Sequence, residues 1–299
     1  MVNSCQRIRV TLLCLSVFIL SGCATTTNMA QLNRLQLHAP IKVLVIEAPV
    51  SIDPGRLKAV LTPDIKAESP ASDELISQGQ KHAQKYAMAS MEAALSKQDQ
   101  FEVVTPLADE SRTPYKIRET SFETPITQDE ADWIQRTTGA NALLRFRITD
   151  YGMTPISWRN GYITFEVTST LAIAGIIAFS GSTAAKAVAG TYLVQEAVEE
   201  SAEAYAGFWA LNVVSRPVRI EAELISLNPV TMVWEDYDTG LSDVKLSRLI
   251  RNVATHEVYN QLDQSTDYAV KDVITNLSAT LLNNIKAPGI YSTSMTKAN

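Results

Sequence analysis

The alternating residues at positions 216–240, RPVRIEAELISLNPVTMVWEDYDTG, constrain the fold of this chain more than any other stretch. Apolar side chains recur at every second position with charged side chains between them, which is the pattern of a strand with one buried face. Asn228-Pro229 is a turn signal, and an apolar return strand follows it. The sequence therefore predicts an antiparallel hairpin whose apolar positions are Val218, Ile220, Ala222, Leu224, Val230, Met232 and Trp234.

Two strands and a helix are expected ahead of this hairpin. The β-branched run IKVLVIEAP at 41–49 ends in proline and predicts a buried strand, and FEVVTPL at 101–107 predicts a second one. Between them, Ser72 is placed to cap a helix whose apolar positions share roughly one face. Those positions are Ile76, Ala83, Ala87, Met91 and Leu95.

A capped helix and two further strands are expected between residues 127 and 169. Thr127-Gln128-Asp129-Glu130 has the form of a capping box, and Gly139 stands where a C-terminal glycine belongs. We expect residues 158–169 to alternate as a second strand, paired with the preceding one through a turn at Gly152 and Pro155. The preceding strand is predicted to be half-buried, because it alternates Leu144, Phe146 and Ile148 with Arg145, Arg147 and Thr149.

Two helices are expected at the C-terminal end, at 242–262 and 270–285. The second has a regular 3.6-residue stripe of apolar side chains, formed by Val270, Val273, Ile274, Leu277, Leu281 and Ile285. The order of these elements implies a mixed sheet flanked by helices, an α+β or α/β fold, with an Ala/Gly-rich helical hairpin inserted.

The N-terminus has the features of an export signal. Arg7 and Arg9 precede an apolar run at 10–20 that is too short to span a bilayer. The run ends in Leu20-Ser21-Gly22-Cys23, which resembles the bacterial lipobox, where the cysteine is diacylated and the chain is cut just before it. Two or more acyl chains make membrane anchoring stable, so Cys23 is the predicted lipidation site.

The residues around Cys23 bear on location and chemistry. Ala24 and Thr25 follow it with no aspartate, which by resemblance to enteric lipoproteins implies sorting to the outer membrane. Cys5 and Cys14 lie in the removed signal, so no disulfide within one chain and no cysteine ligand set is expected. Removal of the signal takes the net charge from −6 to about −8, which argues against nucleic acid as a partner.

The predicted organisation is a single anchored domain. Residues 1–22 are the lipoprotein signal peptide and 23–40 a flexible tether. Residues 41–285 form one periplasmic domain with an insertion at 170–212, and 286–299 are expected to be a disordered tail.

Several of these features together resemble a known group of envelope proteins. The acylated cysteine, the tether, the opening strand, the segment TTGANALLRFRITDYG and the late hairpin are similar to lipoproteins with a fold like the TolB N-terminal domain. That group includes the curli-secretion pore lipoprotein and the activator lipoproteins of penicillin-binding proteins. Thr138-Gly139-Ala140 matches its helix-to-strand step, whereas Ser226-Leu227-Asn228-Pro229 replaces its Asp-rich turn. The resemblance covers residues 41–151 and 213–285, and it implies an α/β domain in an envelope lipoprotein.

The sequence offers no catalytic motif. It contains no Gly-rich phosphate loop, nucleophile elbow, zinc-helix motif or cysteine pair. His38, His82 and His256 lie in different segments, and the adjacent His256 and Glu257 face different directions on a helix. Glu235-Asp236-Tyr237-Asp238 is interpreted as a polar turn rather than a calcium loop. We therefore expect a protein that is not an enzyme, with no catalytic residue, no cofactor and no metal site.

Two other groups of residues have a structural and a functional interpretation. A stripe of glutamates on a predicted helix is either a solvated face or a contact for a basic partner, because like charges at this spacing repel one another. It comprises Glu196, Glu199, Glu200 and Glu203. The tryptophans at strand or near-strand positions are expected in the core rather than at a membrane interface. They are Trp158, Trp209 and Trp234.

The central run TLAIAGIIAFSGSTAAKAVAG at 170–190 has nearly the length of a membrane span. Six strong hydrophobes in 167–185 contribute only about −3 kcal/mol to insertion, which the small polar residues offset. Small residues recur four apart and allow helix backbones to approach closely: Ala174, Ala178, Gly181, Ala185 and Ala189. We favour a helical hairpin packed on its own domain or between subunits, with membrane insertion and a mobile loop as alternatives.

The expected function is that of a non-enzymatic outer-membrane lipoprotein. Its periplasmic domain is predicted to act as a scaffold or assembly factor for other envelope proteins. The partners would be the membrane, through acylated Cys23, and envelope proteins including further copies of this chain. The small residues of the central run and the glutamates at 196–203 form the candidate interface. The alternative is a subunit of an oligomeric secretion pore like that of curli, although only 158–167 shows the alternation that a barrel strand needs.

Overall fold

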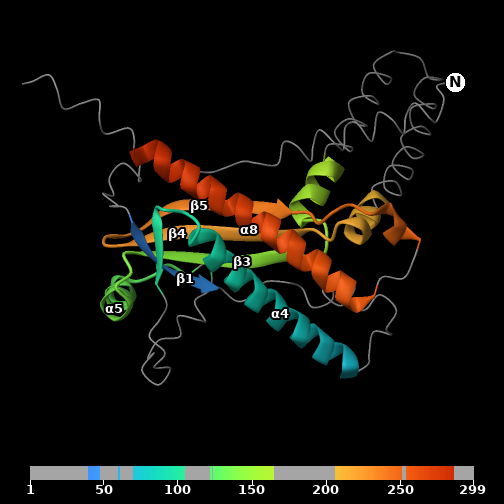
Figure 1. The fold of residues 1–299 in the computed structure, drawn as a ribbon, viewed down its shortest axis with the longest axis horizontal. Helices are drawn as coiled ribbons and strands as arrows, with labels where there is room; N and C mark the ends of the chain where they lie inside the picture. The colour runs from blue at the N-terminus through green and yellow to red at the C-terminus, as the bar shows by residue number, and fades with distance from the viewer. Residues whose placement is uncertain are drawn as a thin grey trace, which may run out of the picture.

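The fold centres on a five-stranded sheet. The computed structural model of the chain describes residues 40–47, 60, 70–104, 122, 124–164, 206–250 and 254–285. Within them, the strand order is β2-β1-β3-β4-β5 (Figure 1).

The sheet combines parallel and antiparallel pairs. Strand β1 (Ile41–Glu47) runs parallel to β2 (Phe101–Val104) and to β3 (Ala142–Tyr151). Strand β4 (Val218–Leu227) runs antiparallel to β3 and to β5 (Val230–Gly240). With the helices packed against this mixed sheet, the predicted α+β class is confirmed.

Two long helices lie side by side across one face of the sheet (Figure 1). They are α4 (Pro70–Leu95) and α8 (Thr255–Ile285). The expected helix is confirmed, but the cap predicted at Ser72 is wrong, because the helix begins at Pro70 and Ser72 lies inside its first turn. Its Ala83, Ala87 and Met91 are buried in the core that α4 and α8 form with the sheet. Burial of this apolar stripe supplies the main stabilisation of the domain.

Helix α5 (Gln128–Thr138) covers part of the opposite face, where its Ala131 and Ile134 pack on a second core. Its predicted caps are both present. The Thr127 hydroxyl accepts a hydrogen bond from the Glu130 amide, and the Glu130 carboxylate accepts one from the Thr127 amide. Gly139 ends the helix in the left-handed conformation, φ 73°, which glycine adopts without strain.

The hairpin at 216–240 is confirmed as β4 and β5. All four apolar positions of β4 are buried as expected, but the strand does not have a single buried face, because Arg219 and Glu223 between them are 8% and 6% exposed. The ion pair between Arg147 and Glu221 lies on that second face. On the return strand the register shifts opposite Leu224 and Ile225. As a result Val233 joins Trp234 in the core, while Met232 is exposed.

The half-buried character predicted for β3 is wrong at Arg145, which is 2% exposed. Its guanidinium forms an ion pair with Glu223 on β4 and donates to the carbonyls of Phe122 and Thr124. Burial raises the pKa of the Glu223 carboxyl, and the hydrogen bond from Arg145 partly opposes that shift. The charge is tolerated inside the sheet because it is paired and hydrogen-bonded.

The second predicted hairpin is wrong. Residues 156–164 are helical, and β3 pairs with β1 and β4 instead. The amides of Trp158 and Arg159 both donate to the carbonyl of Pro155. Proline suits the first turn of a helix because it has no amide hydrogen, and a short alternating run does not outweigh that signal.

The two expected C-terminal helices are also wrong in their boundaries. A single helix, α8, begins at Thr255 and continues to Ile285, so it covers the end of the first predicted range and all of the second. A short 3₁₀ helix, η3 (Leu246–Leu249), precedes it. Residues 241–245 are not helical, and the Ser242 amide donates to the Ser215 carbonyl while the Asp243 amide donates to the Gln264 side chain, so the segment is held as a loop. The apolar stripe itself is confirmed, since Val270, Val273, Ile274, Leu277 and Leu281 are all buried.

The lipidation site and the central run lie outside the described residues, so these predictions stay predictions. They concern Cys23, Ala174, Ala178, Gly181, Ala185, Ala189, Glu196, Glu199, Glu200 and Glu203. No helix in the ranges given above is both long and apolar enough to cross a membrane.

A substitution at Gly240 tests how tightly α8 packs on the sheet. A Cβ atom there would lie 1.9 Å from the carbonyl oxygen of Ser265 and 2.5 Å from the amide of Ala269. Gly240→Ala should therefore lower the free energy of unfolding by about 3 kcal/mol, measured by urea denaturation of the chain from Ala24 onward. Gly161→Ala is the control, because nothing lies within 4 Å of its Cβ position and helix propensity favours alanine. Equal stability of the two variants would contradict the packing described here.

Candidate functional site

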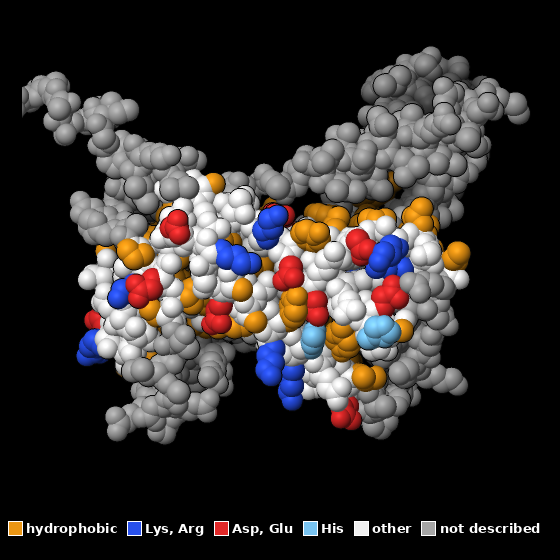
Figure 2. Space-filling view, viewed as in Figure 1, with side chains coloured by type: hydrophobic (Ala, Val, Ile, Leu, Met, Phe, Trp, Pro, Cys, Tyr) orange, Lys and Arg blue, Asp and Glu red, His pale blue; other side chains and the backbone are white. Residues whose placement is uncertain are grey.

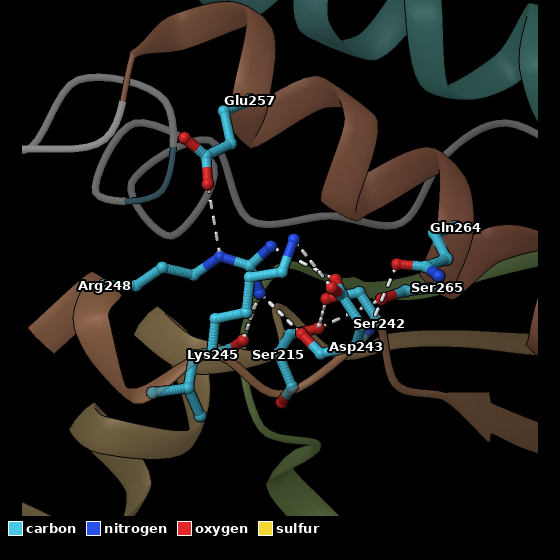
Figure 3. Close-up of polar contacts among 9 residues, drawn as sticks. Ser215, Ser242, Asp243, Lys245, Arg248, Glu257, Gln264 and Ser265 are labelled. Atoms are coloured by element: carbon cyan, nitrogen blue, oxygen red, sulfur yellow. Dashed lines mark hydrogen bonds and ion pairs between the residues drawn. The ribbon is translucent and has the colours of Figure 1, made fainter.

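The candidate site lies at the end of the sheet where β5 is followed by α8. It is formed by residues 241–250, which we call the β5–α8 loop, and by the first turns of α8 (Figure 3). The helices at 156–164 and 206–214 lie at the same end of the domain, away from α5 (Figure 1).

Arg248 holds the loop against the rest of the domain. Its side chain is 2% exposed, and its guanidinium donates to the carbonyls of Val214 and Asp243. It also pairs with the carboxylates of Asp243 at 3.1 Å and of Glu257 at 3.4 Å (Figure 3). One buried cation thus ties the loop to the end of the helix at 206–214 and to the first turn of α8.

The carbonyl of Ser215 is a second group that anchors the β5–α8 loop. It accepts hydrogen bonds from the Ser242 amide at 3.0 Å, the Ser242 hydroxyl at 2.8 Å and the Ser265 hydroxyl at 3.1 Å. The Gln264 side chain accepts from the Asp243 amide at 3.1 Å. The beginning of the loop is therefore fixed to α8 through side-chain and main-chain bonds alike (Figure 3).

Asp243 also pairs with the Lys245 ammonium at 2.9 Å. The hydrogen bonds from Lys245 and then Arg248 lower the pKa of the Asp243 carboxyl. The carboxylate is therefore held in its charged form, and the two cations around it are neutralised locally.

Arg216 is a second buried cation at this end. It has φ 42°, an uncommon backbone conformation for a residue with a side chain, and it is 8% exposed. Its Nη1 donates to the Val60 carbonyl at 3.5 Å, whereas its Nε has no hydrogen-bond partner. Burial, and then the charge of Arg248, lower the pKa of Arg216 to about 10.

Large apolar side chains are exposed around the loop. Val244, Leu246 and Ile250 project from the loop itself, and Ile250 is 88% exposed. Ile156, Ile163 and Trp209 are exposed on the two neighbouring helices. Figure 2 shows hydrophobic side chains gathered toward this end of the domain. Such a concentration of exposed apolar groups is typical of a contact surface.

A polar pocket lies between the loop and α8. Its volume is about 370 Å³, and it is lined by Asp243, Lys245, Arg248, His256, Glu257, Asn260, Gln261 and Gln264. Gln261 is 2% exposed, and neither atom of its side-chain amide has a hydrogen-bond partner. A buried amide with both groups unpaired is unusual and needs an explanation.

The predicted histidines are not brought together. His256 lines the pocket, while His82 on α4 bonds Asp263 of α8 at 2.8 Å and does not line it. His38 lies outside the described residues. In the described part of the chain, no three His, Cys, Asp or Glu side chains are grouped as a metal site would require.

The acidic run at 235–238 is not a turn, as predicted, but part of β5. Glu235 is exposed, whereas Asp236 faces α8 and accepts a hydrogen bond from Asn276 at 2.9 Å. Burial raises the pKa of the Asp236 carboxyl, and the bond from Asn276 partly opposes this. Alternation along the strand therefore places Glu235 on the opposite face from Asp236 and Asp238, which remain neighbours on one face.

The three tryptophans that were predicted to lie in the core differ in their burial. Trp234 is buried in the core as expected, at 1% exposure. Trp158 is half-buried on a helix rather than on a strand, and Trp209 is 50% exposed. The core prediction is therefore wrong for Trp209, which instead belongs to the exposed apolar group at this end.

The residues that matter most here, Arg248 and Gln261, were not singled out from the sequence. The sequence carried no local signal for either residue, because Leu246, Leu249 and Ile250 are three and four residues apart and fit the apolar stripe of the helix that was predicted.

Comparison with known proteins finds no matching family model and no matching curated protein. The solved structures that resemble the chain do so weakly. The hypothetical protein CT253 from Chlamydia trachomatis is 8% identical, with a TM-score of 0.39 over 82% of this chain and 99% of that one. Lipoprotein GNA1162 from Neisseria meningitidis is 11% identical, with a TM-score of 0.31 over 83% of this chain and 99% of that one. The PelC dodecamer from Paraburkholderia phytofirmans is 10% identical, with a TM-score of 0.29 over 80% and 92%. At TM-scores this low, the likeness is too weak to assign a function to this chain.

Arg248 should be the residue on which the loop depends. Arg248→Met removes every bond from the buried guanidinium, including its ion pairs with Asp243 and Glu257, so the free energy of unfolding should fall by about 3 kcal/mol or more. Lys245→Met is the matched control, since its exposed ion pair contributes about 0.5 kcal/mol. Urea denaturation and protection of loop amides from hydrogen exchange measure both effects. Similar losses in the two variants would show that Arg248 does not anchor the loop.

Proposed function

We propose that this chain is an outer-membrane lipoprotein whose periplasmic domain is a non-enzymatic scaffold or assembly factor for envelope proteins. The anchor in this proposal is the acylated thiol of Cys23, and the contact surface is the end of the domain that carries the β5–α8 loop. The argument for the anchor and the argument for the contact surface both start from residues of this chain.

The anchoring part is supported by the N-terminal sequence. Arg7 and Arg9, the apolar run at 10–20 and Leu20-Ser21-Gly22-Cys23 have the order that lipoprotein export and acylation require. The first strand begins at Ile41, so 17 residues separate the acylation site from the folded domain. Fully extended, they would reach about 60 Å, enough for the domain to turn either end toward the membrane.

The observation that carries the contact part is a rigid loop with exposed apolar side chains. Arg248 and the Ser215 carbonyl fix the loop from inside, while Val244, Leu246 and Ile250 point outward. A preformed apolar surface binds with little loss of conformational entropy, and an exposed Trp209 beside it is the residue type that most often anchors protein contacts.

The local charge favours a protein partner over a lipid surface. Lys245 and Arg248 are balanced by Asp243 of the loop and Glu257 of α8, so these four paired side chains together carry no net charge. Membrane surfaces with anionic lipids recruit clusters of basic residues, which are absent from this loop. An apolar centre with a rim of balanced charges is typical of protein interfaces.

The same pairing supports a role without catalysis. Acid–base chemistry needs a group that is free to exchange a proton with a substrate. In the pocket, the carboxylates of Asp243 and Glu257 are engaged by Arg248 through hydrogen bonds at 3.1 and 3.4 Å. They are arranged to hold the loop rather than to react.

Cys23→Ser tests the anchor. The variant should lack the acyl chains and move from the membrane fraction to the soluble periplasmic fraction after cell lysis without detergent. Cys14→Ser is the control, because position 14 lies in the signal and should leave acylation unchanged. Retention of Cys23→Ser in the membrane would overturn the lipid anchor and point to the run at 170–190 instead.

A photoreactive amino acid at position 244 tests the contact surface in living cells. We expect a discrete adduct with another envelope protein, and at least a tenfold lower yield when Leu246→Ser and Ile250→Ser are added. Tyr268→Ser is the matched control, since Tyr268 is a similarly exposed apolar residue on α8 outside the loop. Its adduct yield should not change.

The other outcomes of that experiment contradict the proposal in distinct ways. Adducts only with further copies of this chain would replace the accessory role with self-assembly. Adducts only with lipid would show that the loop contacts the bilayer. A purified ring that conducts ions in planar bilayers would favour the secretion-pore alternative.

A further inference from the structure

Strand β5 is the last strand of the sheet, and it has a neighbouring strand on one side only. It follows β4 in the strand order and is 11 residues long (Figure 1). In the described part of the chain, β4 is its ladder partner, and no other backbone hydrogen bond reaches residues 230–240. The outer side of such a strand presents a row of main-chain N–H and C=O groups, with which a further strand can pair. We call this side of β5 the outer edge.

On the sheet face opposite α8, the charged side chains of the two preceding strands are paired. Arg145 pairs with Glu223, and Arg147 pairs with Glu221. The strand register places Glu235 of β5 directly beside Glu223. Glu235 is exposed and forms no ion pair with any described residue. Carboxylates at opposite positions of adjacent strands repel each other, so a cation on a further strand beside Glu235 would be favourable.

The face toward α8 is also acidic at β5. Asp236 bonds Asn276, and Asp238 accepts a hydrogen bond from the Thr239 amide. Burial raises the pKa of the Asp238 carboxyl, and the negative charges of Asp272 and Asp236 add to that shift. Strand β5 therefore carries three carboxylates on its two faces and no lysine or arginine.

This charge selects among the possible occupants of the outer edge. A second copy of β5 would bring the same carboxylates to the edge, where they would repel one another. The opposite edge strand, β2, is only four residues long, and its one charged side chain is that of Glu102. A basic extended segment instead supplies both the main-chain partners and the missing cations. Met232, which is 43% exposed, lies on the same face as Glu235 and offers an apolar contact beside it.

We propose that the outer edge of β5 binds an extended basic segment of another protein, which adds a sixth strand to the sheet and places a lysine or arginine beside Glu235. Main-chain hydrogen bonds supply the affinity of such strand addition, and the side chains at alternate positions supply its selectivity. The outer edge is a different surface from the β5–α8 loop. The inference therefore goes beyond the contact role proposed above and does not depend on it.

The test uses an acetylated and amidated peptide of alternating lysine and threonine, seven residues long with lysine at both ends. Added to the ¹⁵N-labelled chain from Ala24 onward, it should give saturable shifts centred on the β5 amides, with a dissociation constant on the order of 1 mM. The outer amides of β5 should then exchange their hydrogens at least threefold more slowly. The same peptide with proline at each threonine position keeps its charge but not its strand pairing, and it should bind at least fivefold more weakly.

Variants at position 235 test the charge. Glu235→Gln should weaken peptide binding by about threefold, and Glu235→Lys by at least tenfold, because the second change replaces attraction with repulsion. Both variants should remain folded in urea denaturation, since Glu235 is exposed and unpaired. Glu102→Gln is the matched control, because Glu102 is an exposed glutamate on the opposite edge strand, and its affinity for the peptide should be unchanged.

Four results would overturn the inference. Equal affinity for the threonine and proline peptides would show charge attraction without strand addition. Unchanged affinity in Glu235→Lys would remove the role of that carboxylate, and shifts centred on β2 would place the peptide at the wrong edge. Slow exchange of the outer β5 amides before peptide is added would show that this chain or a second copy already occupies the edge. The crosslinking at position 244 reports on the β5–α8 loop, so its outcome is independent of all four.

Discussion

The close approach of α8 to strand β5 at Gly240 is the contact on which the rest of this domain depends. The carbonyl of Ser265 and the amide of Ala269 occupy the space that any larger side chain at position 240 would need. The helix can therefore neither move away from the sheet nor slide along it without losing this fit. The hydrogen bond from Ser265 to the Ser215 carbonyl fixes the same register from the strand β4 side.

This fixed register lets one helix perform two tasks. Along the second half of α8, Val270, Val273 and Leu277 fill the core against the sheet. Along the first half, Val258 and Leu262 continue this core, while Glu257 and Gln261 line the polar pocket beside the β5–α8 loop. Because the apolar side chains fix the helix along its length, the polar side chains that anchor the loop are held in place as well.

Local patterns in the sequence predicted the elements whose signals are contained within a few residues. The caps at Thr127 and Gly139 and the alternation along β4 are of this kind, and the structure confirms them. The errors came from contacts between distant residues. Arg145 looked like a solvent-facing position because its partner, Glu223, lies 78 residues away on another strand. The helix predicted from Ser242 is absent, and long-range bonds hold the segment as a loop instead: Ser242 bonds the Ser215 carbonyl and Arg248 bonds the Val214 carbonyl, which no local pattern reveals.

The polar pocket beside the β5–α8 loop could not be predicted from the sequence, because it too is formed by residues from different segments. Gln261 looks like an ordinary helix residue in the sequence, and its burial arises only from the packing of segments that are distant along the chain. Its Nε2 and Oε1 have no hydrogen-bond partner among the described residues, and neither has the Nε of Arg216 at the same end of the domain, whereas Arg248 and the Ser215 carbonyl are fully engaged. Buried polar groups without partners lower the stability of a fold, because each one has lost its hydrogen bonds to water. This end of the domain therefore combines firmly anchored groups with polar groups that the fold leaves unsatisfied.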